Sequence, residues 1–174
     1  AQDDAVKVQR ESLEAIRSGL DNHQFVLYYQ PKVNMRTGTV TGFEALIRWQ
    51  HPERGLLNPI DFLPVIENNA MSIEVGEWVI DRALTQISLW QTMGLKLPIS
   101  TSVNIAAVQL QQTDFVDRLK ILLAAHPDVE PRYLELEVLE TTAIDDVYHV
   151  STIMNACIAQ GVNFSLDDFG TGYS

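Results

Sequence analysis

The chain has 174 residues, 46% of them hydrophobic, and a formal net charge of −11 at pH 7. Its length fits one domain with an ordinary apolar core, and no stretch approaches the roughly 18 consecutive apolar residues of a membrane span. The negative charge argues against binding to nucleic acid polymers or anionic lipid. A protein this acidic that acts on a phosphate ester needs bound cations to bring its carboxylates and the substrate together.

The N-terminal segment and the cysteine content bear on the cellular compartment. The first 20 residues are acidic and amphipathic and lack the apolar core of a signal peptide. Cys157 is the only cysteine, which excludes a disulfide framework and a thiolate metal site, and we interpret it as a small core residue. We therefore expect a cytoplasmic location and no membrane contact from this segment, although other segments of a parent protein can still anchor it in a membrane.

The chain divides into a short N-terminal segment and one domain. Residues 1–20 are predicted to form a helix or linker, because Leu13, Ile16 and Leu20 have helical spacing. Within 21–174, runs of β-branched and aromatic residues bounded by turn signals predict strands at 25–29, 41–49, 98–104, 133–140 and 162–168. Helical periodicity, proline starts and glycine stops predict helices at 59–68, 72–93, 114–126 and 146–160.

Strands that alternate with helices favour βα units and a largely parallel sheet. A closed barrel of such units takes about 250 residues, and only about five strands are predicted here. We therefore predict an α/β fold of the TIM-like (β/α) barrel type, incomplete and cut after its fifth strand, with the first strand antiparallel. An open sheet in its own right is the alternative.

Residue parity separates two faces on the predicted strands, because side chains alternate along a strand. One face is apolar and suits packing against helices. The other is polar or small, whereas an ordinary barrel interior holds branched apolar residues. The residues of this second face are Gly42, Glu44, Leu46, Arg48, Ser100, Ser102, Asn104, Tyr133, Glu135, Glu137, Asn163, Ser165 and Asp167.

Carboxylates and one amide gather in the last half of these strands, where barrel active sites form. They are Glu44, Asn104, Glu137, Asp167 and Asp168. Each of them alone is explained well enough as a hydrogen-bonded strand end or a helix cap. Their convergence favours an all-oxygen ligand set for magnesium, manganese or calcium rather than zinc.

Several motifs follow one another in a fixed order from about residue 25 to the last residue. They are YYQPKV, EALIR, SVN, LELEVLE and DDFGTGYS. This set closely resembles the EAL-domain family, whose members are bacterial phosphodiesterases that linearise the second messenger cyclic di-GMP. The resemblance makes 21–174 an EAL-type barrel domain, truncated after its fifth strand.

The resemblance also implies roles for individual residues. Glu44, Asn104, Glu137 and Asp167 are implied metal ligands, with Asp167 shared between two ions and Asp168 serving the second ion. Glu140 is implied to hold the DDFGTGYS loop in place, and with the carboxylates it completes the implied catalytic set of Glu44, Glu137, Asp167, Asp168 and Glu140. Arg48 is implied to contact a substrate phosphate, and Gln30 and Leu46 to border the nucleotide. The usual family form has threonine directly before the last glutamate of LELEVLE, and this chain has Leu139 at that position.

The expected function is hydrolysis of cyclic di-GMP to the linear dinucleotide with two Mg²⁺ or Mn²⁺ ions, which lower the pKa of a bound water and clamp the phosphodiester. The alternatives are a receptor that binds cyclic di-GMP without cleaving it and a different metal-dependent barrel, such as a lyase that stabilises an enolate. Members of the family use a lysine and a further glutamate from later strands, so we expect this truncated chain alone to be inactive. Lys32 is interpreted as a solvated surface charge and His126 as a surface position.

An incomplete barrel exposes a sheet edge, which invites association. We therefore expect the chain to form a homodimer or to be marginally stable by itself.

Overall fold

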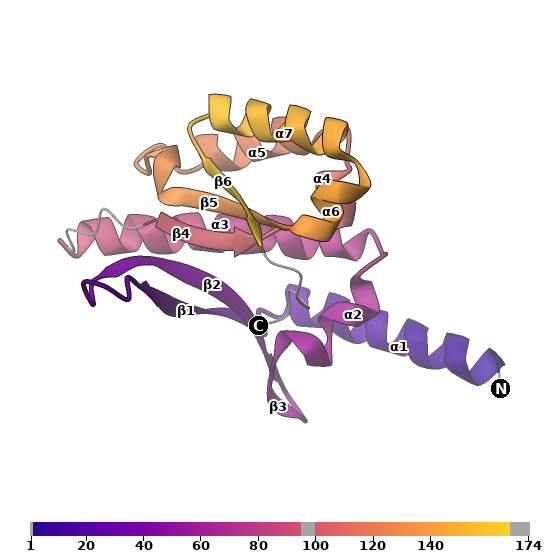
Figure 1. The fold of residues 1–174 in the computed structure, drawn as a ribbon. Helices are drawn as coiled ribbons and strands as arrows, with labels where there is room; N and C mark the ends of the chain where they lie inside the picture. The colour runs from indigo at the N-terminus through magenta and orange to yellow at the C-terminus, as the bar shows by residue number, and fades with distance from the viewer. Residues whose placement is uncertain (1, 95–99, 168–174) are drawn as a thin grey trace.

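The computed structural model describes residues 2–94 and 100–167 (Figure 1). Within these residues one mixed sheet is covered by helices. The strands are β1 (Phe25–Val33), β2 (Val40–His51), β3 (Gly55–Leu57), β4 (Ser100–Asn104), β5 (Leu134–Leu139) and β6 (Asn163–Asp167). The helices are α1 (Gln2–Asp21), α2 (Leu63–Ile66), α3 (Met71–Thr92), α4 (Ala107–Leu110), α5 (Phe115–Ala124), α6 (Glu140–Asp145) and α7 (Val147–Ala159), with 3₁₀ turns at Pro59–Asp61 and Pro131–Tyr133.

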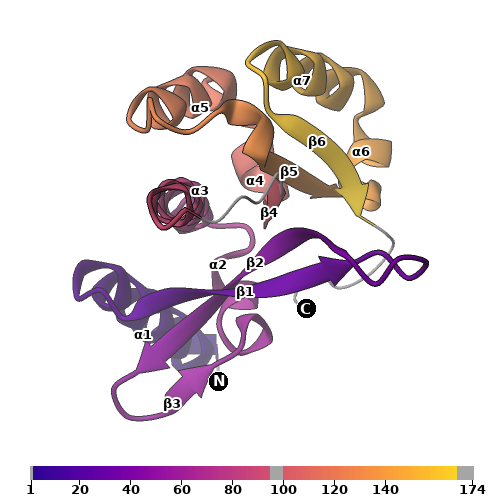
Figure 2. The same ribbon diagram turned by 90° about the vertical axis from the view of Figure 1, so that its left-hand side faces the viewer.

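The sheet has the strand order β1-β2-β4-β5-β6, and β3 pairs with β2 outside this path. β1 and β2 pair antiparallel, whereas β2, β4, β5 and β6 pair parallel. In Figure 2 the strands follow an arc, with α3, α5 and α7 on its convex side. The predicted α/β class, the parallel βα units and the antiparallel first strand are confirmed.

Element boundaries differ from the sequence prediction in a few places. β1 continues through Pro31 to Val33, which its position at the sheet edge allows because an edge strand tolerates the missing N–H of proline. β3 and the short helices α4 and α6 lie in segments that were predicted as loops or strand. In place of one helix over 59–68 there is a 3₁₀ turn followed by α2.

The helix ends follow the predicted glycine signals. α3 and α7 are followed by Gly94 and Gly161, whose φ angles of 75° and 98° lie in the left-handed region that favours glycine. These two stops fix where the chain leaves the helix layer to begin the next strand.

The apolar core lies between the convex face of the sheet and the helices. Val103, Leu134, Leu136 and Val138 have no exposed surface, and they pack in one cluster with residues of α3, α5 and α7. Cys157 lies in the same cluster with no exposed surface, so the prediction of a core cysteine is confirmed.

The N-terminal helix joins this body through its second half. Ile16 of α1 is 1% exposed and belongs to the core cluster. Figure 1 shows the first half of α1 extending away from the rest of the molecule. Farther along the chain, the His126 side chain is only 16% exposed and pairs through Nε2 with Asp81 Oδ1 of α3 at 2.8 Å, so its interpretation as a surface position was wrong.

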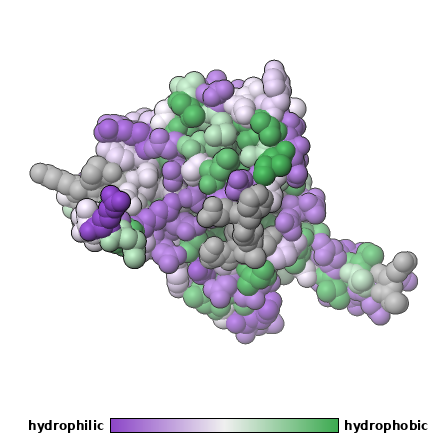
Figure 3. All heavy atoms as spheres, in the orientation of Figure 1, coloured by the Kyte–Doolittle hydropathy of each residue, from purple (hydrophilic) through white to green (hydrophobic). Residues whose placement is uncertain are grey.

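Apolar side chains also reach the surface near the last strand. Ile144, Val147, Tyr148 and Leu166 are exposed, and Figure 3 shows apolar surface on the upper part of the molecule, where β6, α6 and α7 lie in Figure 1. Over the residues that the structure describes, no helix combines the length and the apolar character needed to cross a membrane.

Candidate functional site

The register of the strands brings the predicted polar residues onto one face of the sheet. Gln30 is opposite Glu44, Glu44 is opposite Ser102, and Ser102 is opposite Glu135. One step nearer the carboxyl ends of the strands, Asn104 is the partner of Glu137. The parity prediction is therefore confirmed for β2, β4 and β5, and Gln30 of β1 lies on the same face.

Glu44 and Asn104 meet although 60 residues separate them in the chain. Asn104 Nδ2 donates a hydrogen bond to Glu44 Oε1 over 3.3 Å, and both side chains are half-buried. Because the amide nitrogen of Asn104 faces the carboxylate of Glu44, its amide oxygen is free of this hydrogen bond and can act as a second oxygen donor beside Glu44. The two residues thus have the donor chemistry of a hard cation site.

Lys32 lies among these carboxylates, and its interpretation as a solvated surface charge was wrong. Its Nζ donates to Glu137 Oε1 over 2.6 Å and to Ser102 Oγ over 2.7 Å, and it lies 3.5 Å from Glu135 Oε2. Ser102 in turn donates its hydroxyl hydrogen to Glu135. The Glu137 side chain is only 11% exposed, so the ammonium supplies the positive partner that a buried carboxylate requires.

These contacts shift the pKa of Lys32. Burial alone lowers it, because desolvation disfavours the charged ammonium. The hydrogen bond to Glu137 and the negative charges of Glu137, Glu135 and Glu44 outweigh burial, and the pKa lies above its usual value. Lys32 therefore stays positively charged throughout the physiological pH range.

The residues predicted to contact substrate line the same face. Leu46 is buried, whereas Gln30 is exposed at the middle of β1. The guanidinium carbon of Arg48 lies 5.7 Å from the ring centre of Tyr28, and Nη1 donates to the backbone oxygen of Ile47 over 2.9 Å. This cation–π contact and the hydrogen bond restrict the orientation of the Arg48 guanidinium.

A cavity of about 300 Å³ opens at the carboxyl ends of β2, β4 and β5. Leu46, Asn104, Glu137 and Leu139 contribute to its wall. Glu67, which follows α2, adds a further carboxylate to the rim. Two of the predicted ligands, Asn104 and Glu137, therefore border a hollow at the end of the sheet where ligands of parallel α/β folds bind.

The last predicted residues lie at the end of β5 and β6. Glu140 was predicted to end the strand, but it begins α6, and Leu139 is the residue before that helix. Leu139 is the register partner of Asp167, which ends β6. Asp168 and the rest of the DDFGTGYS segment lie outside the described residues.

The described side chains fit a hard divalent cation by their chemistry. Glu44, Glu137 and the amide of Asn104 offer oxygen donors, and the ammonium of Lys32 already shows that this face accommodates a positive charge. Within 2–94 and 100–167, no three His, Cys, Asp or Glu side chains gather closely enough to hold a metal ion by themselves.

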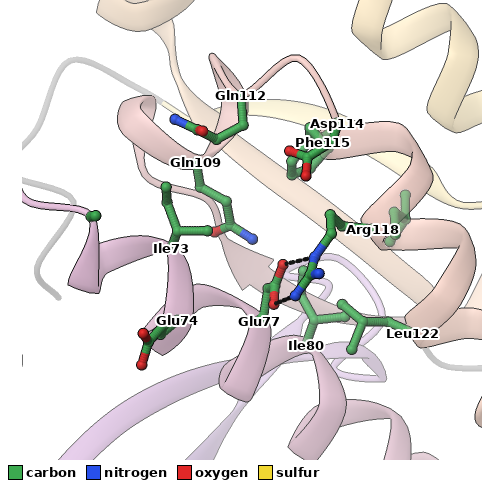
Figure 4. A pocket seen from close by; sticks show the side chains of 12 residues that line it. Ile73, Glu74, Glu77, Ile80, Gln109, Gln112, Asp114, Phe115, Arg118 and Leu122 are labelled. Atoms are coloured by element: carbon green, nitrogen blue, oxygen red, sulfur yellow. Dashed lines mark hydrogen bonds and ion pairs between the residues drawn. The ribbon is translucent and has the colours of Figure 1, made fainter. Parts of the chain in front are cut away.

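A second cavity of about 190 Å³ lies between α3, α4 and α5, away from the acidic face. Arg118 donates from Nε and Nη2 to the two carboxylate oxygens of Glu77, over 2.7 and 2.6 Å (Figure 4). Gln109 also lines this cavity, and a Cβ on Gly76 would come within 1.9 Å of its Oε1. We assign this region to packing between helices, because none of the described residues predicted for the site lines it.

Comparison with known proteins identifies relatives of the chain. The family model described as "EAL domain" matches residues 13–174. The bifunctional diguanylate cyclase/cyclic di-GMP phosphodiesterase MucR of Pseudomonas aeruginosa is 42% identical over 166 residues, which are 95% of this chain and 24% of that protein. The cyclic di-GMP phosphodiesterase PA2567 of the same organism is 35% identical over 150 residues, which are 86% of this chain and 25% of that protein.

A solved structure described as the PaMucR phosphodiesterase in complex with c-di-GMP has the same fold. It matches with a TM-score of 0.86 and 41% identity over 94% of this chain and 66% of that chain. The likeness confirms the prediction of a TIM-like barrel. The chain spans about a quarter of the length of the curated relatives named above.

Proposed function

The chain belongs to the EAL domain family, and we propose on this basis that it contributes the acidic centre of a barrel that hydrolyses cyclic di-GMP to the linear dinucleotide. The observation that carries the proposal is the convergence of Glu44, Asn104 and Glu137 on one face of the sheet, where Asn104 and Glu137 line a cavity of about 300 Å³. Names of relatives support the reaction, since MucR and PA2567 are both described as cyclic di-GMP phosphodiesterases.

The cofactor in this proposal is Mg²⁺ or Mn²⁺. By their donor chemistry, the residues that would hold the ions are Glu44, Asn104, Glu137 and Asp167, with Asp168 at a second ion. When bound, the ions supply charge that offsets the repulsion between carboxylates and phosphodiester and lower the pKa of a coordinated water. The protein's own contribution is to hold the oxygen donors of Glu44, Asn104, Glu137 and Asp167 on strands, where their side chains are half-buried.

Substrate contacts are proposed for residues on the same face. Arg48 pairs with a phosphate, because a planar guanidinium matches two phosphate oxygens and Tyr28 holds its plane. Leu46 offers a buried apolar surface to a nucleobase. Gln30 borders the nucleotide from β1, where its exposed amide can donate or accept.

The test is chromatography of cyclic di-GMP after incubation with Mg²⁺ or Mn²⁺ and a protein that carries this chain within a complete barrel. Glu44→Gln is the decisive variant, since it keeps the size and hydrogen bonds of the side chain but removes a ligand charge. We expect conversion to the linear dinucleotide, a loss of at least about 100-fold in Glu44→Gln, and no turnover by the 174-residue chain alone.

The matched control is Glu53→Gln, an exposed carboxylate in the turn before β3. Unchanged hydrolysis in a folded Glu44→Gln protein would contradict the proposed centre. Binding of cyclic di-GMP without any turnover by the complete barrel would replace the enzyme with a receptor.

We also propose that the chain associates with a second copy. β6 pairs only with β5 among the described residues, and an unpaired strand edge is a template for association. Sedimentation velocity tests this: a dimer is expected, and a stable monomer at micromolar concentration would contradict it.

A further inference from the structure

Lys32 makes contacts that none of the roles above uses. Its Nζ donates hydrogen bonds to Glu137 Oε1 at 2.6 Å and Ser102 Oγ at 2.7 Å, and it forms an ion pair with Glu135 Oε2 at 3.5 Å. Ser102, which is 1% exposed, closes the network because its hydroxyl donates to Glu135. One lysine from β1 thus links two glutamates of β5 through a serine of β4.

The topology explains how Lys32 reaches so far across the sheet. β1 and β4 are separated by β2, and the residue of β2 opposite Lys32 is Gly42, which is in turn opposite Ser100. Glycine has no side chain, so nothing on β2 at this level stands between the stem of Lys32 and the two strands beyond. The long aliphatic stem can therefore lie along the sheet while its charged end reaches Glu137.

The ammonium group of Lys32 lies among several carboxylates. Glu135 and Glu137 point to the same face of one strand, and Glu44 faces them from β2. Carboxylates held this close repel one another unless a positive charge lies among them. In the described structure that charge is Lys32, and Glu137, its nearest partner, is also a proposed ligand of the divalent ion.

We propose that Lys32 is an internal counter-cation of the acidic centre, a positioning residue that holds Glu135 and Glu137 in place before a divalent ion binds and then competes with that ion for Glu137. The competing half of this inference rests on the proposed function, since it requires a divalent ion at Glu137. The holding half does not, because it concerns the protein without metal.

The experiment compares Lys32→Met and Lys32→Arg with the unmodified chain, with Lys120→Met on the exposed face of α5 as the matched control. Thermal unfolding in chelator measures the holding role, and calorimetry with Mn²⁺ alone measures the competition. Lys32→Met is expected to melt lower in chelator and to bind Mn²⁺ about tenfold more tightly, because a like charge next to the ion has been removed. Lys32→Arg and Lys120→Met are expected to stay close to the unmodified chain in both measurements.

Two results would overturn the inference. One is weaker or unchanged Mn²⁺ binding by folded Lys32→Met. The other is equal melting temperatures of Lys32→Met and the unmodified chain in chelator. A lysine that only supports the fold would lower the melting temperature but leave Mn²⁺ affinity unchanged, so the calorimetry separates the two roles.

Further variants keep the test decisive when Lys32→Met does not fold. Lys32→Gln retains two N–H donors but no charge, and Lys32→Gln combined with Glu137→Gln removes both charges of the pair; a double-mutant cycle of these two substitutions in chelator then measures their coupling. Additive effects in that cycle would refute the holding role. Absence of Mn²⁺ binding by the unmodified chain would refute the cation centre in the proposed function, while the cycle in chelator would still decide the role of Lys32.

Discussion

The two faces of the sheet bury opposite kinds of side chain from the same strands. On the convex face, Val103, Leu134 and Leu136 have no exposed surface and pack against helices. On the concave face, Ser102 and Glu137 alternate with them along β4 and β5 and join a charged network. Successive residues of a strand alternate between these faces. Core residues that stabilise the fold and polar residues of the candidate site therefore alternate along each strand. Substitutions of adjacent residues should accordingly change either the unfolding free energy or ligand binding.

The largest effect on stability is expected at the convex face. Leu136→Ala removes a fully buried side chain and should lower the free energy of unfolding by about 2–5 kcal/mol, through lost transfer free energy and a residual cavity. Denaturant unfolding measures it, and the neighbouring Glu135→Gln on the other face is the matched control, expected to lose less. An equal or larger loss in Glu135→Gln would show that the concave face also carries the fold.

A smaller effect, confined to ligand binding, is expected at Arg48. Replacing it by lysine keeps the charge but removes the planar fork that stacks on Tyr28, so affinity for cyclic di-GMP should fall about tenfold with unfolding unchanged. Titration of a complete barrel with the dinucleotide measures this, and Arg54→Lys, in the exposed turn before β3, serves as control. Equal affinities of the Arg48 and Arg54 variants for cyclic di-GMP would show that Arg48 does not contact the dinucleotide.

A still smaller effect is expected in the helix layer, at the pair of Arg118 and Glu77. Both N–H groups of the fork meet the carboxylate, but the arginine is largely exposed, so solvent and salt screen the attraction. Arg118→Gln should cause a slight loss of thermal stability at low salt that disappears at high salt. A large loss that salt does not change would mean that the pair holds α3 and α5 together.

The last effect concerns Cys157 and is absent near neutral pH, because it emerges only at alkaline pH. Burial raises the pKa of its thiol to about 11 from an ordinary value of 9.0. In the unfolded chain the thiol ionises first, so its contribution to stability is complete below pH 9 and is lost as the pH rises toward 11. The difference in unfolding free energy between the unmodified chain and Cys157→Ala should shrink over this range, and a constant difference would contradict the assignment.

Much of this division between faces could be predicted from the sequence. The alternation of polar and apolar residues in segments such as YLELEVLE assigns each side chain to a face without any knowledge of neighbouring strands. The pairing of Glu44 with Asn104 then follows, because the carboxyl ends of parallel strands lie at one edge of the sheet.

What could not be predicted depends on contacts between distant segments. Lys32 looks like a turn residue in the sequence, and only the strand order together with the absence of a side chain at Gly42 lets it reach Glu137. Glu140 continues an alternating pattern but begins α6, since the strand ends where its pairing with β6 ends. The contact of His126 with Asp81 joins α3 to the segment after α5, and no local pattern encodes it.

The central claim is that the concave face is a cation centre built from Glu44, Asn104 and Glu137. Calorimetric titration of the chain with Mn²⁺ tests it most directly, with Glu137→Gln beside Glu130→Gln, an exposed glutamate before β5. We expect saturable binding of Mn²⁺ that Glu137→Gln abolishes and Glu130→Gln retains. Equal binding by the two variants, or none by the unmodified chain, would contradict it.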